Sequence, residues 1–207
     1  MSAAMATKPH AAAYPSRTRH RLETRDRVFD AALAEFRRVG VGAAQIEDIV
    51  RRAGVARGTF YLHFPTKDHV LMELLRRNQA ALAERLRATR AAATRTFLRR
   101  LVDFILDDAQ EADAALWHEL FSILGRHASE LRTEENPLVE VLSAFLAAAQ
   151  ERGELRRDLS AFDLTSVFLP GVLGLLQMRL DSPPAELRQA LYRVVDIFVR
   201  GIETESA

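Results

Sequence analysis

Apolar residues recur at three- and four-residue steps along most of this 207-residue chain, and this helical spacing constrains the fold more than any other feature. Val28, Phe29, Ala32, Leu33 and Phe36 are the first example, with arginine and glutamate residues among them. No alternating strand pattern of useful length and no convincing internal repeat accompanies it. We therefore expect an all-α protein of about nine helices.

Glycine, proline and capping residues predict where the helices begin and end. The first 16 residues are rich in alanine, serine, threonine and proline, so they are expected to form a disordered tail. Gly40 and Gly42 are expected to end the first helix, and Thr66 is a natural N-cap for a long helix. Further amphipathic helices are expected at about 97–106, 114–124, 138–152, 161–180 and 185–202.

Positive charge is concentrated in the first third of the chain. Residues 1–70 hold 12 Lys+Arg and 7 Asp+Glu, whereas the remaining 137 hold 17 and 21, so the two parts carry +5 and −4. This distribution favours an anionic partner for the N-terminal part alone. The same split also arises by chance, so charge by itself leaves both interpretations open.

The residue inventory argues against an enzyme, a metal centre and a bound cofactor. There is no cysteine, which excludes disulfides, zinc–thiolate sites and thiol nucleophiles and agrees with a reducing cytoplasm. The six histidines lack metal-ligand spacing, and neither a glycine-rich phosphate loop nor a serine nucleophile elbow occurs. We therefore expect no catalytic residues.

A membrane or secretion segment is not expected either. The N-terminal residues lack the apolar core of a signal peptide. The longest apolar run, residues 164–178, is shorter than the roughly 20 residues that span a bilayer. We predict a cytoplasmic protein with no membrane partner, in which this run is buried against other protein segments.

The stretch IEDIVRRAGVARGTFYLHFPTKD, residues 46–68, predicts two short helices joined by a tight turn. Gly54 stands where the turn needs a left-handed backbone. The apolar residues of the pair are expected to face the first helix; they are Ile46, Ile49, Val50, Val55 and Phe60. The outward residues then offer hydrogen-bond donors, a flexible cation and a glycine that permits close approach, which suits the major groove of DNA.

This surface supplies the predicted DNA contacts. Lys67 is expected beside the backbone N–H groups that open the next helix, where an anion binds readily. An ordinary packing corner between two helices is the alternative interpretation of the pattern. The predicted DNA-binding residues are Gln45, Arg57, Gly58, Thr59, Tyr61, Leu62, His63 and Lys67.

A family resemblance is carried by Ala53-Gly54-Val55, Gly58, Tyr61, His63-Phe64 and Lys67. These residues resemble the pattern of the TetR (tetracycline-repressor-like) family of transcriptional regulators over about 50 residues, 21–71. The resemblance implies a helix-turn-helix DNA-binding domain at 17–65 and an effector-binding and dimerisation domain at 66–207. It also implies a homodimer that binds a palindromic double-stranded operator, usually as a repressor, and is released by a small-molecule effector.

Two departures from the family pattern concern the starts of the second and third helices. The family usually has serine or threonine there, whereas this chain has Ala44-Gln45 and Ala56. A missing cap costs about 1 kcal/mol of helix stability. In the family these hydroxyls also often touch phosphate. We expect some of the arginines near the start of the first helix to compensate along the DNA backbone or in a minor groove; a solvated arginine-rich helix start is the alternative. These arginines are Arg17, Arg19, Arg21, Arg25 and Arg27.

The second domain is expected to hold a pocket between its helices that favours an apolar or aromatic effector. Most of its large apolar residues are expected in an ordinary core, and His118 is expected in the core or at the surface more than at a ligand. The candidates are Phe97, Leu101, Phe104, Ile105, Trp117, His118, Phe121, Leu142, Phe145, Phe168, Gln177 and Met178. A ligand that tilts the helix at 66–90 would change the separation of the two recognition helices.

Two broad apolar faces near the C-terminus predict a four-helix interface between subunits. A monomer core is the alternative. The candidate interface residues are Val167, Gly171, Gly174, Leu175, Leu191, Val194 and Phe198. The rival function for the whole chain is an architectural protein that binds DNA without sequence preference and without an effector.

Overall fold

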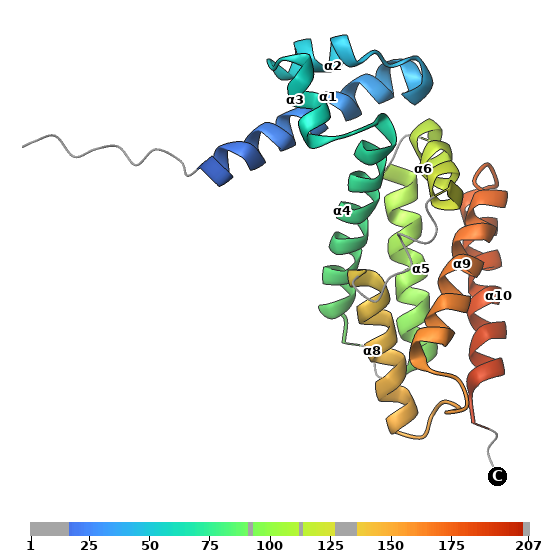
Figure 1. Ribbon diagram of the computed structural model, residues 1–207. Helices are drawn as coiled ribbons and strands as arrows, with labels where there is room; N and C mark the ends of the chain where they lie inside the picture. Colours follow the sequence, from blue (N-terminus) through green and yellow to red (C-terminus); the bar gives the residue numbers. More distant parts are fainter. Residues whose placement is uncertain (1–16, 91–92, 112–113, 127–135, 205–207) are drawn as a thin grey trace, which may run out of the picture.

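The chain is helical throughout the part for which the structure, a computed structural model, gives a description: residues 17–90, 93–111, 114–126 and 136–204. Within these ranges nine helices and no strand occur (Figure 1), which confirms the all-α prediction. The expected disordered tail at 1–16 lies outside them. The helices are α1 (Arg17–Ala43), α2 (Ile46–Ala53), α3 (Arg57–His63), α4 (Lys67–Arg87), α5 (Thr94–Glu111), α6 (Ala114–Arg126), α8 (Pro137–Glu151), α9 (Ala161–Met178) and α10 (Pro184–Ile202).

The helices form a small head and a longer body. Helices α1, α2 and α3 make the head, and α4 descends from it into a bundle with α5, α8, α9 and α10 (Figure 1). Helix α6 lies at the junction and contacts both α1 and α4. The head therefore rests on two helices of the body.

Local capping explains why the predicted starts of α8 and α9 are close to the observed ones. The side-chain oxygen of Asn136 accepts the backbone N–H of Leu138 at 3.0 Å, with Pro137 at the first helical position of α8. Ser160 and Asp163 form a reciprocal capping box at the start of α9. Helix α5 extends past its expected 97–106 at both ends, because the apolar spacing marked only its buried stretch.

The head is held by an aromatic core beneath its two short helices. Phe60 and Phe64 are fully buried, and the Phe64 ring lies 6.3 Å from that of Phe29 on α1. Gly54 has φ 66° and ψ 40°, the left-handed conformation that the turn was predicted to need. Gly40, with φ 81°, breaks the helical backbone near the end of α1, while helical turns continue to Ala43.

The starts of α2 and α3 lack side-chain caps, as the sequence predicted. Neither Gln45 nor Ala56 bonds the first turn of its helix through a side chain. Ala56 has φ −75° and ψ 153°, the extended conformation in which a serine hydroxyl reaches the first turn. Ala56→Ser is therefore expected to raise the free energy of unfolding by about 1 kcal/mol, measured by urea denaturation. Ala56→Val, which adds bulk without a hydroxyl, is the control, and equal stabilisation by both variants would contradict the capping argument.

Helix α9 is the most apolar helix of the body. Among the described residues it alone is long and apolar enough to pass a length-and-composition test for a membrane span. One such helix is weak evidence, because the core helix of a bundle passes the same test. Here α9 packs against both α8 and α10, and a third of its residues are buried. The structure thus places the predicted apolar run within the bundle.

Candidate functional site

Helix α3 presents most of the predicted DNA-binding residues on one exposed surface of the head. Its single fully buried residue is Phe60, whose ring lies 6.2 Å from that of Phe64 in the core of the head. Tyr61 and Leu62 are exposed although both are large, because the short helix turns its other face to the core. An exposed leucine and tyrosine beside glycine and arginine form a surface that can enter a groove and contact base edges and sugars.

Arg57 is held in place by a partner from the neighbouring helix. Its guanidinium pairs with the carboxylate of Glu47 on α2 and lies 5.9 Å from the centre of the Tyr61 ring. Both members of the ion pair are largely exposed, so the pair is weak and can open. Arg57 can therefore leave Glu47 for another partner at little cost in free energy.

His63 lies at the end of α3 near two arginines of α1. Its partial burial lowers the pKa of the imidazole below its usual value, and the positive charges of Arg21 and Arg25 lower it further. The neutral form of His63 is therefore favoured near pH 7, so the ring is suited to accept or donate a hydrogen bond rather than to supply charge.

Lys67 has a different environment from the expected one. Its ammonium donates hydrogen bonds to the carbonyl oxygens of Val41 at 2.6 Å, Gly42 at 3.0 Å and Ala44 at 3.1 Å. These carbonyls belong to the last turn of α1 and to the residue that follows it, so Lys67 fastens the start of α4 to the head. A lysine has three N–H donors, and here all three have acceptors.

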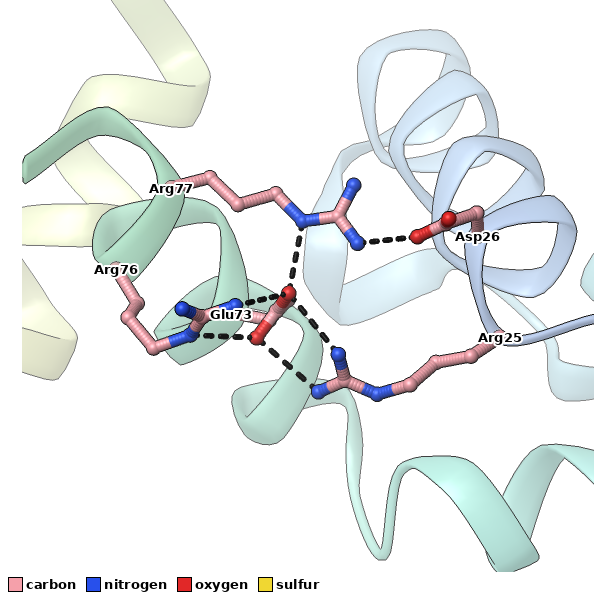
Figure 2. Close-up of polar contacts among 5 residues, drawn as sticks. All are labelled: Arg25, Asp26, Glu73, Arg76 and Arg77. Atoms are coloured by element: carbon pink, nitrogen blue, oxygen red, sulfur yellow. Dashed lines mark hydrogen bonds and ion pairs between the residues drawn. The ribbon is translucent and has the colours of Figure 1, made fainter. Parts of the chain in front are cut away.

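A buried carboxylate connects α4 to α1 at the same junction (Figure 2). Glu73 is 5% exposed and accepts hydrogen bonds from Arg25 of α1 at 3.0 and 3.1 Å. It also accepts from Arg76 at 3.0 and 2.8 Å and from Arg77 at 2.7 Å, both on α4. Arg77 in turn donates to Asp26 of α1 at 2.5 Å. This cluster of five side chains is called the junction cluster below.

The junction cluster strongly favours the ionised form of Glu73. Burial alone would raise the pKa of this carboxyl, but the hydrogen bonds from Arg76, Arg25 and Arg77 outweigh it and lower the pKa to about 2. The Arg25 guanidinium also lies 4.9 Å from the Phe64 ring, and that of Arg77 lies 4.1 Å from the Phe29 ring. The cluster thus joins the aromatic core of the head to α4.

The body contains a cavity of about 580 Å³ between α4, α5, α6, α8 and α9. Its lining is mostly apolar, with a few amide and hydroxyl groups. Asn136 donates to Gln79 of α4 at 2.9 Å across one wall. The indole Nε1 of Trp117 is buried without a hydrogen-bond partner among the described residues. The lining residues are Leu75, Asn78, Gln79, Leu82, Ile105, Asp108, Trp117, Phe121, Ser122, Asn136, Leu138, Val139, Phe162, Thr165, Ser166, Leu169, Pro170, Leu173, Gly174 and Gln177.

Four of the predicted pocket residues line this cavity: Ile105, Trp117, Phe121 and Gln177. The others lie elsewhere. Phe97 and Phe145 stack with their ring centres 3.8 Å apart and border a separate cavity of about 270 Å³. Leu101, Leu142 and Phe168 are closed in the core, Phe104 lies against Arg85, and His118 and Met178 are at the surface.

The predicted interface residues fall into two groups: some are at least partly exposed, and others are buried or line the cavity. Val167 and Gly171 are exposed on α9, and Leu175, Val194 and Phe198 are half-buried. Leu191 is fully buried within its own bundle, and Gly174 lines the cavity. Ile197 on α10 is 73% exposed and was not among the candidates.

Several residues at these sites escaped the sequence prediction. Glu47, Glu73 and Asp108 are charged residues whose importance depends on partners from other helices. Glu73 did carry a signal, because it stands among apolar residues of α4 and precedes two arginines. Pro170 carried another, because proline is rare inside a helix. No cluster of potential metal ligands was found among the described residues.

Comparison with known proteins agrees with this architecture. The family model "Bacterial regulatory proteins, tetR family" matches residues 28–74. The chain is 31% identical over 167 residues to the HTH-type transcriptional regulator SrpR of Pseudomonas putida, covering 77% of this chain and 76% of SrpR. It is 32% identical over 176 residues to the HTH-type transcriptional regulator BetI of Cronobacter sakazakii, covering 80% and 84%.

A solved structure extends the similarity to the whole fold. The Thermus thermophilus protein FadR, a TetR-family transcriptional repressor crystallised with lauroyl-CoA, superposes with a TM-score of 0.74 and 25% identity. The superposition covers 88% of this chain and 97% of FadR. The head with its two short helices, the cavity in the body and these relatives agree: the chain belongs to the TetR family of bacterial transcriptional regulators.

Proposed function

We propose that this protein is a ligand-responsive repressor. It binds a palindromic operator as a homodimer through α3, and a small apolar or aromatic molecule in the cavity releases it. One observation carries the proposal: the helices that wall the cavity also hold the head. Helices α4 and α6 both line the cavity and both contact α1. FadR, a repressor found with a bound ligand, supports the same use of this fold.

The contacts between α4 and the head explain how a ligand would release the protein from DNA. A ligand that displaces α4 acts on the head through Lys67 at the start of the helix and through Glu73 one and a half turns later. Arg126 at the end of α6 pairs with Asp68 of α4 at 3.2 Å, so the two helices are joined at the junction. DNA and ligand then favour different positions of the head, with a coupling free energy of about 1–3 kcal/mol.

Dimerisation through α9 and α10 places two recognition helices on one DNA. The exposed apolar residues Val167 and Met178 of α9 and Ile197 of α10 are candidates to be covered by a second subunit. Two α3 helices related by a two-fold axis would enter successive major grooves about 34–36 Å apart.

The function is tested by fluorescence-anisotropy titration with DNA from beside the protein's own gene and with a scrambled fragment, at two salt concentrations. The expected result is a preference for the native fragment that persists at the higher salt. Equal and salt-sensitive binding to both fragments would contradict a local operator and favour an architectural DNA-binding protein.

Arg57 is expected to read a base. Arg57→Ala should therefore relax sequence preference at one position of each half-site, with a loss of about 1–3 kcal/mol for the preferred base. The measurement is competition by operator variants that differ at single positions. Glu47→Gln is the matched control, because it frees Arg57 while keeping the guanidinium. Uniform weakening on every sequence would make Arg57 a phosphate contact instead.

A further inference from the structure

The charge of the cavity identifies the class of its ligand. Among the described lining residues Asp108 is the single charged one, and neither lysine, arginine nor histidine occurs with it. We propose that the cavity binds a lipophilic organic cation, whose ammonium group pairs with Asp108 and whose apolar body lies against the aromatic residues. This inference rests on the proposed function and specifies its effector.

Asp108 has a partner in the present structure that a ligand can replace. Arg85 of α4 donates to Asp108 at 2.5 Å, and its other terminal nitrogen lies 3.7 Å from Asp107. Two carboxylates thus share one guanidinium, which leaves a net negative charge beside the cavity. When a ligand ammonium pairs with Asp108 in place of Arg85, Arg85 keeps Asp107 as its partner. The exchange therefore leaves each of these partly exposed charges with a partner.

The end of α5 adds to this negative potential. Asp108 lies in the last turn of α5, where the carbonyl groups carry the negative end of the helix dipole. Cationic side chains usually complement that end, but the last turn of α5 contains no basic residue. Arg85 of α4 is the cation at this end in the structure, and it faces two carboxylates as well as the helix end, so a ligand cation would add a second complement.

The part of the lining that α9 forms offers a further acceptor for an N–H donor. Pro170 is in the interior of α9 and has no amide proton, so the carbonyl of Ser166, one turn earlier, lacks its helical donor. Both residues line the cavity. Trp117 and Phe121, whose ring centres are 5.5 Å apart, provide aromatic faces that attract an organic cation.

These features separate this cavity from one that binds an anionic ligand. An acyl-CoA carries phosphate groups, and proteins hold phosphates with arginine, lysine or clustered backbone N–H groups. A fatty acid likewise needs a donor for its carboxylate. The described lining does contain neutral donors, such as the indole N–H of Trp117, but no cationic side chain to compensate the charge of a phosphate or carboxylate, and Asp108 adds a carboxylate of the same sign.

The ion pair between Arg85 and Asp108 also connects the ligand to α4. Arg85 lies near the far end of α4, with its guanidinium 4.1 Å from the Phe104 ring of α5. Its bond to Asp108 joins α4 to α5 when no ligand is present. A ligand that competes for Asp108 weakens this connection, so the same group that selects the cation also loosens the helix that reaches the head.

Binding can be measured directly because Trp117 is the one tryptophan of the sequence and lines the cavity. The probes share one scaffold and differ in charge: 4-(aminomethyl)biphenyl, 4-(hydroxymethyl)biphenyl and biphenyl-4-carboxylate. The amine is expected to bind roughly tenfold more tightly than the alcohol. This is the gain in affinity expected when a charge-assisted hydrogen bond to a partly exposed carboxylate replaces a neutral one. The carboxylate is expected to bind most weakly.

Two variants test whether Asp108 causes the preference for the amine over the alcohol. Asp108→Asn should remove the advantage of the amine and leave the affinity for the alcohol within about twofold. Glu84→Gln is the control, because Glu84 is an exposed acidic residue of α4 outside the cavity, paired with Arg87. The ratio of its affinities for the amine and the alcohol should equal that of the wild type. Equal binding of the three probes, an unchanged ratio in Asp108→Asn, or no response to the amine would each overturn the inference.

Operator affinity measured with the same probes separates the two proposals. If the alcohol binds and releases DNA but the amine has no advantage, the inference fails and the proposed function stands. If the amine has the expected advantage but leaves operator affinity unchanged, the ligand class stands and the effector role fails.

Discussion

Glu73→Gln is expected to lower the free energy of unfolding by about 3 kcal/mol at pH 7, the largest stability effect predicted for a single side chain of this protein. The variant keeps the shape of Glu73 but removes the charge that Arg25, Arg76 and Arg77 surround. The estimate follows from the lowering of the Glu73 pKa from 4.5 to about 2. Urea denaturation of wild type and variant measures it.

The pH dependence tests whether charge is the cause. Because the pKa of Glu73 is lowered in the folded state, its stabilisation is present above pH 4.5 and is lost as the pH falls towards about 2. The difference in stability between wild type and Glu73→Gln should therefore shrink over that range. Glu84→Gln, on the same helix but in an exposed pair, should cost less than about 1 kcal/mol. A difference that stays constant with pH would assign the effect to packing.

Ile197→Glu is expected to convert the proposed dimer to a monomer and to lower operator affinity by about 100-fold or more. Two linked recognition helices gain roughly 10²–10⁴ in affinity over one, and a glutamate on the proposed α9–α10 interface places like charges opposite each other at the two-fold axis. Ile197 is 73% exposed in the single subunit, so the fold of each subunit should be retained. Sedimentation velocity and operator titration measure the two effects.

The control for this variant is Leu159→Glu. Leu159 is also an exposed apolar residue, but it lies in the segment between α8 and α9 and not on the α9–α10 face. It should leave both the dimer and operator affinity unchanged. If Ile197→Glu remains a dimer with full operator affinity, the interface is formed by another surface.

The sequence predicted the head most completely because its structure depends on local rules. Gly54 was predicted to be left-handed from the turn alone, and Phe60 was predicted to face inward from helical spacing. The missing caps at Gln45 and Ala56 were also readable from residue type. Lys67 was located correctly in the chain, but its three carbonyl acceptors come from a turn more than twenty residues earlier.

The cavity was predicted only in part because helical spacing identifies the buried face of a helix and not the space behind it. Trp117 and Leu142 have the same spacing signature, yet the first lines the cavity and the second is closed in the core. Aromatic residues that fill a core and aromatic residues that line a pocket are chemically the same. Their difference depends on how five helices pack.

The sequence by itself determined the nine described helices, their order and the outward face of α3, because propensity, capping and apolar spacing act within a few residues. Tertiary structure alone decided which charges meet. Glu73 with Arg25, Glu47 with Arg57 and Asp108 with Arg85 join residues of different helices. An ion pair needs its two groups within about 4 Å, and for residues 10 to 48 positions apart only the packing of the helices sets that distance.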